Sequence, residues 1–151
     1  MLQILATAVA ITDNPLDGLW ANFMDYDPEK MVLAITHVEG IHSRVQMMRN
    51  FPVGIQGREG SSGYAWRNDK ILFIDDTGKD GGIISFIDNK ERGLLRGVIN
   101  IPAKLSPDEG GVLNIGSPSS GLMTEALRSR AERLGELVRH WLQVRHGLDA
   151  L

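Results

Sequence analysis

The sequence predicts an α+β fold in which a mostly antiparallel sheet of about five to six strands is covered by helices. Three observations favour this fold. An apolar segment opens the chain and apolar residues with helical spacing lie near its C-terminal end, several short strand-like segments lie between them, and a four-residue turn joins the first two of these segments. Helices at the ends and strands in the middle are typical of α+β domains. The 151 residues, 42% of them apolar, have the size and composition of one compact soluble domain.

The N-terminal part of the chain predicts a helix followed by a hairpin. Residues 1–11, MLQILATAVAI, lack a basic region and are too short to span a bilayer, so we interpret them as a helix. The Pro and Gly of residues 13–18 end it. Residues 19–27 alternate as a strand does, residues 27–30 form an acidic turn, and residues 31–38 are rich in β-branched side chains.

The second half predicts three further strands and a long helix. Residues 71–75, 94–101 and 111–117 are short and apolar, and the last two are separated by the polar loop PAKLSPDEGG. Residues 122–145 carry apolar side chains at alternating steps of four and three, which indicates an amphipathic helix. The interpretation is therefore one domain over residues 1–151, with the sheet and any pocket within residues 19–117.

Several kinds of chemistry are excluded by the residues present. The chain has no cysteine, which excludes disulfides, thiolate catalysis and cysteine-bound zinc, and fits a cytoplasmic location. A net charge of −3 gives no general attraction to nucleic acid. The four histidines do not have the spacing that places two imidazoles on one helical face, so we expect no metal site. Nothing in the sequence indicates a membrane partner.

The glycine-rich stretch GIQGREGSSG does not carry a catalytic motif. A nucleophile elbow needs glycine both two residues before and two residues after the serine, and Glu59 (before Ser61) and Tyr64 (after Ser62) stand where glycine is required. We instead expect Ser61 or Ser62 to cap a short helix that ends near Asn68. The adjacent Asp75 and Asp76 point to opposite faces of their strand, so they cannot act together as a catalytic acid and base.

Four segments, taken in order, resemble the GAF family of small sensory domains. They are the hairpin ANFMDYDPEKMVLAITHVEG, the segment GSSGYAWRNDKILFIDD, the strand RGVINIP and the strand GGVLNIGS. The resemblance covers most of the chain and implies a GAF-like fold, in which the N- and C-terminal helices pack together on one face of the sheet. One departure is Gly97, where the family often has serine.

The resemblance also narrows the ligand. Family members that carry a bilin attach it to a cysteine, and relatives that reduce methionine sulfoxide work through cysteines, so neither activity is expected here. The signature of cyclic-nucleotide-binding members is not recognisable. Residues 77–93 match no family segment; in ligand-binding members this connection often closes over the pocket. The expected ligand is therefore an unidentified small molecule, and no cofactor is assigned.

In GAF-like folds the pocket lies between the sheet and the helices that cross it. Large rings and polar side chains in this region are the candidate ligand contacts, although the rings also suit an ordinary core. These candidates are Tyr64, Trp66, Phe73, Asp75, Phe86, Arg96 and Asn100, and Asn22 is a further polar candidate if its side chain points inward.

The C-terminal helix predicts a dimer. Leu127, Leu134, Val138 and Trp141 lie at coiled-coil spacing and are the predicted interface. We therefore expect a non-enzymatic sensory or regulatory domain that binds a small molecule and signals through its terminal helices to an effector protein or fused domain. The alternative is a GAF-like dimerisation or protein-interaction module without a ligand.

Overall fold

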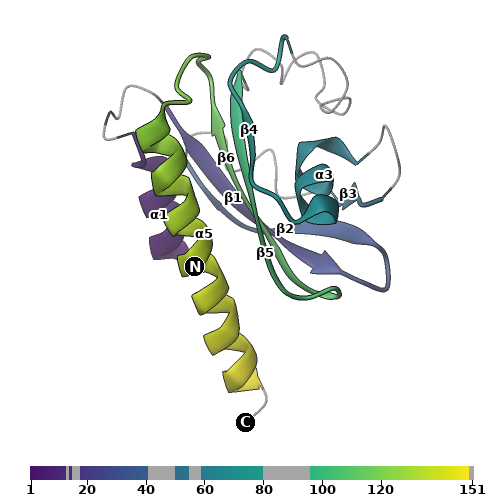
Figure 1. The fold of residues 1–151 in the computed structure, drawn as a ribbon. Coiled ribbons are helices and arrows are strands. Elements are labelled where there is room, and N and C mark those ends of the chain that lie inside the picture. The colour runs from purple at the N-terminus through teal and green to yellow at the C-terminus, as the bar shows by residue number, and fades with distance from the viewer. Residues whose placement is uncertain (13, 15–17, 41–49, 55–58, 80–95, 150–151) are drawn as a thin grey trace.

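The protein forms a six-stranded sheet with helices on both faces, within the residues that the structure describes (Figure 1). The structure is a computed structural model, and it describes residues 1–12, 14, 18–40, 50–54, 59–79 and 96–149. The elements in chain order are α1 (Leu2–Val9), β1 (Trp20–Asp27), β2 (Val32–Glu39), β3 (Asn50–Pro52), α3 (Gly60–Asn68), β4 (Leu72–Ile74), β5 (Gly97–Ser106), β6 (Glu109–Ser117) and α5 (Glu125–Asp149).

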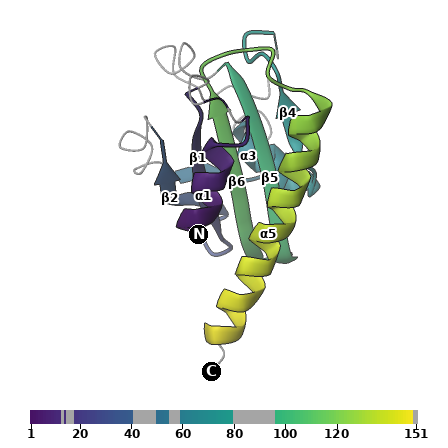
Figure 2. The same ribbon diagram turned by 90° about the vertical axis from the view of Figure 1, so that its left-hand side faces the viewer.

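The strands are antiparallel to each of their neighbours and follow the order β3-β2-β1-β6-β5-β4. Helices α1 and α5 cover one face of this sheet, which we call the α5 face, and α3 covers part of the other, the α3 face (Figures 1 and 2). The predicted α+β fold is therefore confirmed, including the contact between the terminal helices.

The predicted first hairpin is present, and its turn is held by the side chain of Asp27. The carboxylate of Asp27 accepts hydrogen bonds from the amides of Glu29 (3.0 Å) and Lys30 (3.2 Å). These bonds lower the pKa of Asp27, with the Lys30 amide contributing most. A short polar side chain that binds the backbone two or three residues ahead is a common way to close such a turn.

Several element boundaries differ from the sequence interpretation. The expected polar loop between the last two strands is wrong, because β5 continues to Ser106 and β6 starts at Glu109. Pro102, the first residue of the expected loop, lies inside β5 at the position opposite Val112. The terminal helices also shift: α1 ends at Val9, and α5 runs from Glu125 to Asp149.

Thr124 explains where α5 begins. Its hydroxyl accepts a hydrogen bond from the amide of Leu127 (3.2 Å), which is the geometry of a helix cap. None of the helices in the described part of the chain has the length and apolar character needed to cross a lipid bilayer.

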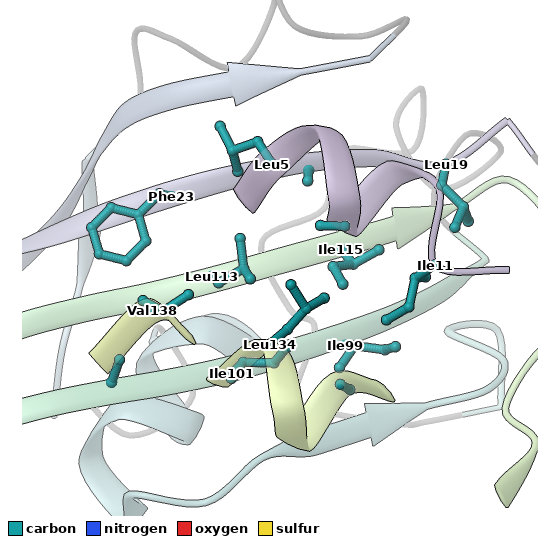
Figure 3. Close-up of a cluster of buried hydrophobic side chains, with 14 of the residues drawn as sticks. Leu5, Ile11, Leu19, Phe23, Ile99, Ile101, Leu113, Ile115, Leu134 and Val138 are labelled. Atoms are coloured by element: carbon teal, nitrogen blue, oxygen red, sulfur yellow. The ribbon is translucent and has the colours of Figure 1, made fainter. Parts of the chain in front are cut away.

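The main core lies between the sheet and the two terminal helices (Figure 3). Alternate residues of the central strands, among them Phe23, Ile101 and Leu113, are fully buried there against α1 and α5. Each such side chain contributes about 1.5–3 kcal/mol when it leaves water. A smaller cluster on the α3 face contains Met24, Leu33, Ile35, Val53, Trp66 and Val112.

Candidate functional site

The middle of the α3 face is polar, which distinguishes it from the opposite face. Asn22 of β1 lies opposite Asn114 of β6, and Asn114 lies opposite Asn100 of β5. The three side chains therefore form one line across three adjacent strands, which we call the asparagine row. Their exposed fractions are only 1 to 2%. Buried polar groups are costly unless they are hydrogen bonded, so this row needs an explanation.

The carboxamides of the row bind one another in a single direction. Asn100 Nδ2 donates to Asn114 Oδ1 (2.7 Å), and Asn114 Nδ2 donates to Asn22 Oδ1 (2.7 Å). Each group thus donates toward β1 and accepts from the β5 side. Aligned hydrogen bonds polarise one another, so the row acts as a chain with a donor end at Asn22 and an acceptor end at Asn100.

Ser62 of α3 forms hydrogen bonds with two side chains of the asparagine row. Its hydroxyl donates to Asn114 Oδ1 (2.9 Å) and accepts from Asn100 Nδ2 (3.3 Å). The expectation that one of the two serines caps this helix is wrong, because α3 follows Glu59 and no side chain caps its start. The Ser62 hydroxyl is used instead to tie the helix to the polar centre of the sheet.

Glu59 fixes the position of α3. Its buried carboxylate accepts hydrogen bonds from the Gly54 amide (3.2 Å) and from Arg67 Nε (3.0 Å), and it also pairs with Arg67 Nη2 (2.5 Å). A buried carboxylate must be paired in this way to be tolerated. The helix that carries Ser62 is therefore anchored at both its first and its last turn.

Apolar side chains surround the row along the strands. On one side lie Trp20 and Val98, and on the other lie Met24 and Val112, all buried. The indole of Trp20 lies directly against Gly116, where an added Cβ would overlap ring atoms Cζ2 and Cε2. A glycine at this position leaves the space that the ring occupies beside β6. The site is thus a narrow polar strip between apolar walls, the composition that small-molecule sites share.

Two of the predicted ligand contacts, Tyr64 and Trp66, belong to helix α3, which covers part of the α3 face. Tyr64 is 36% exposed, with the Arg67 guanidinium 5.7 Å from its ring centre. Trp66 is buried, with its ring centre 4.7 Å from that of Tyr26 and Lys104 Nζ 4.5 Å from its ring. Trp66 therefore packs α3 onto the sheet and is part of the smaller core.

Three of the other candidates do not join the asparagine row. Phe73 lies opposite Ile99 and packs on the α5 face, where the Arg128 guanidinium is 4.7 Å from its ring. Asp75 accepts a hydrogen bond from the Met123 amide (3.2 Å), just before α5. Arg96 is exposed and donates to both carboxylate oxygens of Asp76 (3.1 Å each).

Asp76 itself has a structural role in this turn. The Gly78 amide, and after it Arg96, holds the pKa of the Asp76 carboxyl below its usual range. Phe86, the remaining ring candidate, lies outside the described residues. Of the predicted contacts, Asn100 and Asn22 are the two that meet in one site, and a ligand-binding role for any of the candidates stays a prediction.

Asn114 and Ser62 were not singled out by sequence reasoning as site residues. The sequence nevertheless contains a pattern that indicates this site. The segments WANFM, VINIP and VLNIG each have one asparagine at the centre of an apolar strand. An asparagine is unfavourable in the middle of a buried strand, so three of them indicate a shared polar site.

The predicted dimer residues are largely used within the chain. Leu127, Leu134 and Val138 are 0 to 5% exposed and belong to the main core. Trp141 is half-buried and lies edge-on to Phe23, with ring centres 6.0 Å apart. Their helical spacing is therefore explained by packing on their own sheet. The large apolar side chains that remain exposed on α5 are Leu137, Val144 and Leu148.

A groove of about 580 Å³ lies between the two terminal helices. Its α1 side is formed by small side chains, Ala6, Thr7 and Ala10, and its α5 side includes Arg133 and Leu137. Arg130 crosses from α5 to the end of the first helix, where Nη1 donates to the carbonyl of Ile11 (2.6 Å).

Comparison with solved structures places the fold. The structure is similar to the GAF domain of a phosphoenolpyruvate-protein phosphotransferase from Coxiella burnetii, with 14% identity and a TM-score of 0.75 over 99% of this chain and 86% of that chain. It is similar to free methionine-R-sulfoxide reductase from Neisseria meningitidis, solved with its substrate, at 17% identity and a TM-score of 0.73 over 97% and 80% of the two chains.

A third similar structure is the second GAF domain of DevS from Mycobacterium smegmatis, with 17% identity and a TM-score of 0.69 over 98% and 94% of the two chains. No known family description and no curated protein matches the chain. Likeness at this level of identity shows the fold, so this chain has a GAF-like fold. Both reductases and GAF domains share it, and the fold alone does not separate catalysis from binding.

Proposed function

We propose that this GAF-like domain is a non-enzymatic sensory or regulatory domain that binds a small molecule on the α3 face of its sheet. The observation that carries the proposal is the buried asparagine row with Ser62 above it. A sheet face that only had to pack would be cheaper to build from apolar side chains, because each buried carboxamide must recover its desolvation cost through hydrogen bonds. A polar strip between apolar walls suits recognition of a ligand.

The groups that the described part of the site offers favour a non-enzymatic role. Carboxamides do not ionise and cannot transfer protons as general acids or bases. The chain contains no cysteine, so a thiol-based reduction of the kind expected for sulfoxide-reducing relatives has no nucleophile. The hydroxyl of Ser62 is bonded to carboxamides, which do not activate a nucleophile.

The same strands link this site to the terminal helices. Asn100 alternates along β5 with Ile99 and Ile101, and both of these pack in the core against α5. A ligand that shifts the row changes the surface on which α5 rests. If the domain has two conformations that differ in the arrangement of α5 and in affinity for the ligand, binding changes the populations of these conformations. An effector or fused domain attached to the helix then detects the change.

The test starts with the protein purified from its native host. We expect mass spectrometry of the denatured sample to detect a co-purifying small molecule, and thermal shift with a panel of nucleotides and metabolites to find a ligand that raises Tm. Asn100→Val should weaken binding of that ligand by about tenfold. Ser61→Ala is the matched control, since it changes the neighbouring serine. No co-purifying molecule and a flat thermal-shift panel would refute the proposal.

An exposed apolar stripe favours the second candidate function, a homodimer through the terminal helices. Leu137, Val144 and Leu148 are 53%, 49% and 63% exposed, and steps of seven and four place them along one side of α5. The C-terminal end of α5 extends beyond the edge of the sheet in both views (Figures 1 and 2). The stripe is separate from the residues that pack on the sheet, so the helix can serve both contacts.

Sedimentation at tens of micromolar protein tests this alternative. We expect a dimer for the natural chain and a monomer for Val144→Glu/Leu148→Glu, with unchanged unfolding of the monomer because both side chains are exposed. Gln143→Glu adds a negative charge at another exposed position of α5 and should leave the dimer intact. A natural chain that sediments as a monomer would exclude the homodimer.

A further inference from the structure

We infer that the ligand of the α3 face presents an N–H or O–H donor to Asn100 Oδ1, and that it is an uncharged molecule such as a carboxamide or lactam and not an anion. This inference rests on the proposed function and specifies the chemistry of its ligand. It follows from three properties of the row, namely an acceptor without a partner, donors that are all in use, and a fixed direction of polarity.

The acceptor at the end of the row is buried and unpaired. Asn100 Oδ1 has no hydrogen-bond partner among the described residues, although the side chain of Asn100 is only 1% exposed. A buried carbonyl oxygen without a partner is costly, and native proteins rarely retain one without a use. A donor on a ligand would remove this cost, and its binding energy would include the recovered hydrogen bond.

The hydrogen-bond donors at the Asn100 end of the row already have acceptors. The carboxamide of Asn100 has two N–H groups, and Nδ2 donates to both Asn114 Oδ1 and Ser62 Oγ. The Ser62 hydroxyl hydrogen is directed to Asn114 Oδ1. The end of the row at Asn100 therefore offers an incoming group an acceptor and no donor. A carboxylate or phosphate oxygen can only accept, so it has nothing to bind here.

The direction of the row strengthens the same preference. Because Asn100 donates to Asn114 and Asn114 donates to Asn22, the negative ends of all three amide dipoles point away from β1. Asn100 Oδ1 is the terminal oxygen of this aligned series, and the series makes it a stronger acceptor and a repulsive neighbour for an anion.

The surroundings disfavour a full charge of either sign. Apart from Asn114 of the row itself, the residues next to Asn100 along and across the strands are Val98, Pro102 and Leu72, all of them apolar. Among the described residues, the hydrogen-bond partners of Asn100 and Asn114 are carboxamides and the Ser62 hydroxyl, none of them charged. A cation placed here would lose its hydration and gain one carboxamide oxygen, which is not enough to compensate. A neutral donor remains as the best fit.

Matched pairs of small probes test the inference. Each pair has the same carbon skeleton and differs in the polar group: acetamide against acetate, propionamide against propionate, and benzamide against benzoate. The readout is the side-chain amide resonances of the row in ¹⁵N-labelled protein, followed during titration. We expect each carboxamide to shift the Asn100 resonance and to bind at least about tenfold more tightly than its carboxylate.

The outcomes separate this inference from the proposed function. If carboxylates shift the row as strongly as carboxamides, the inference is wrong and the site remains a small-molecule site of other chemistry. If neither member of any pair shifts the row and the native protein carries no ligand, both fail. Asn100→Val should abolish the preference for carboxamides, and a folded variant that kept it would also overturn the inference. The titration of the natural chain decides the question even if that variant does not fold.

Discussion

The two faces of the sheet are built from alternate residues of the same strands, and they differ in polarity. On the α5 face, Ala21 and Phe23 of β1 and Leu113 and Ile115 of β6 join one continuous apolar core. On the α3 face, Asn22 and Asn114 occupy the positions between them. Each strand therefore contributes to stability on one side and places a costly polar group on the other.

This difference teaches where to look for function in the domain. Apolar packing accounts for the centre of the α5 face, where the buried side chains form one core cluster with α1 and α5. The centre of the α3 face is not explained by packing, since it is buried and polar and ends in an acceptor that has no partner among the described residues. Substitutions on the two faces should therefore have different effects.

Phe23→Ala should destabilise the domain most. Phe23 is fully buried on the α5 face, where its ring lies close to Trp141 and against Gly111. Removing the ring leaves a cavity in the main core, and we expect a loss of about 3–5 kcal/mol in the free energy of unfolding, measured in urea. Gln143→Ala, at an exposed position of α5, should change it by less than about 0.5 kcal/mol. A loss below 1 kcal/mol for Phe23→Ala would contradict the assignment of the main core.

Asn114→Val should cost less, about 2–4 kcal/mol, because the change removes the hydrogen bonds that Asn22, Asn100 and Ser62 make to this side chain. The combined replacement of all three asparagines by valine and of Ser62 by alanine should be more stable than Asn114→Val, since it leaves no stranded partner. Urea unfolding of both variants checks this order. If the combined variant is the less stable one, the row is a structural element of the fold and the contrast between the faces disappears.

Gly116→Ala tests the wall of the site with an effect of about 1–3 kcal/mol. The added methyl group would overlap the indole of Trp20, which must then move. Trp20→Leu in the same chain should restore part of the loss by making room. Gly147→Ala is the matched control, because it lies in α5 with open space around it and should stabilise the helix by about 0.5–1 kcal/mol. Thermal unfolding of the four proteins decides the result.

The sequence predicts the sheet well and the site only in part, for a physical reason. Alternation along a strand shows which residues share a face, so the parity of Asn22 and of Asn100 was readable. It does not show which face a strand presents to which helix, and for this reason Phe73 and Asp75 were grouped with Asn100 although they lie on the α5 side. Register between distant strands is also not local information, and it is the register that brings Asn114 between the other two.

The role of Ser62 shows a second limit of the same kind. A serine near the start of a helix is usually a cap, and only the packing of α3 on β5 and β6 reveals its bonds to two carboxamides. The stripe on α5 was identified correctly as helical. Its division into a side that packs on the sheet and a side that remains exposed depends on how the helix is rotated, and a helical spacing alone allows both.

His37 gives the smallest predicted effect and tests whether the α5 face tolerates charge at its rim. The ring lies beside Phe23 and Trp141, and burial lowers its pKa below the ordinary value of 6.5; Asp25 raises the pKa, while the amino terminus and Arg145 lower it. Because the unfolded chain then binds a proton more readily than the folded one, stability is fullest above pH 6.5 and is lost as the pH falls through the window below it.

The comparison of natural protein and His37→Gln by urea unfolding between about pH 8 and about pH 5 measures this effect. The natural protein should lose more stability over this range than the variant, and the two should differ least at the alkaline end. If the stability of the natural protein and that of the variant change equally with pH, burial beside the apolar face does not lower the pKa of His37. A natural protein that gains stability relative to the variant on acidification would show that Asp25, which lies at the edge of the same face and pairs with Arg145 at 2.8 Å, dominates over burial.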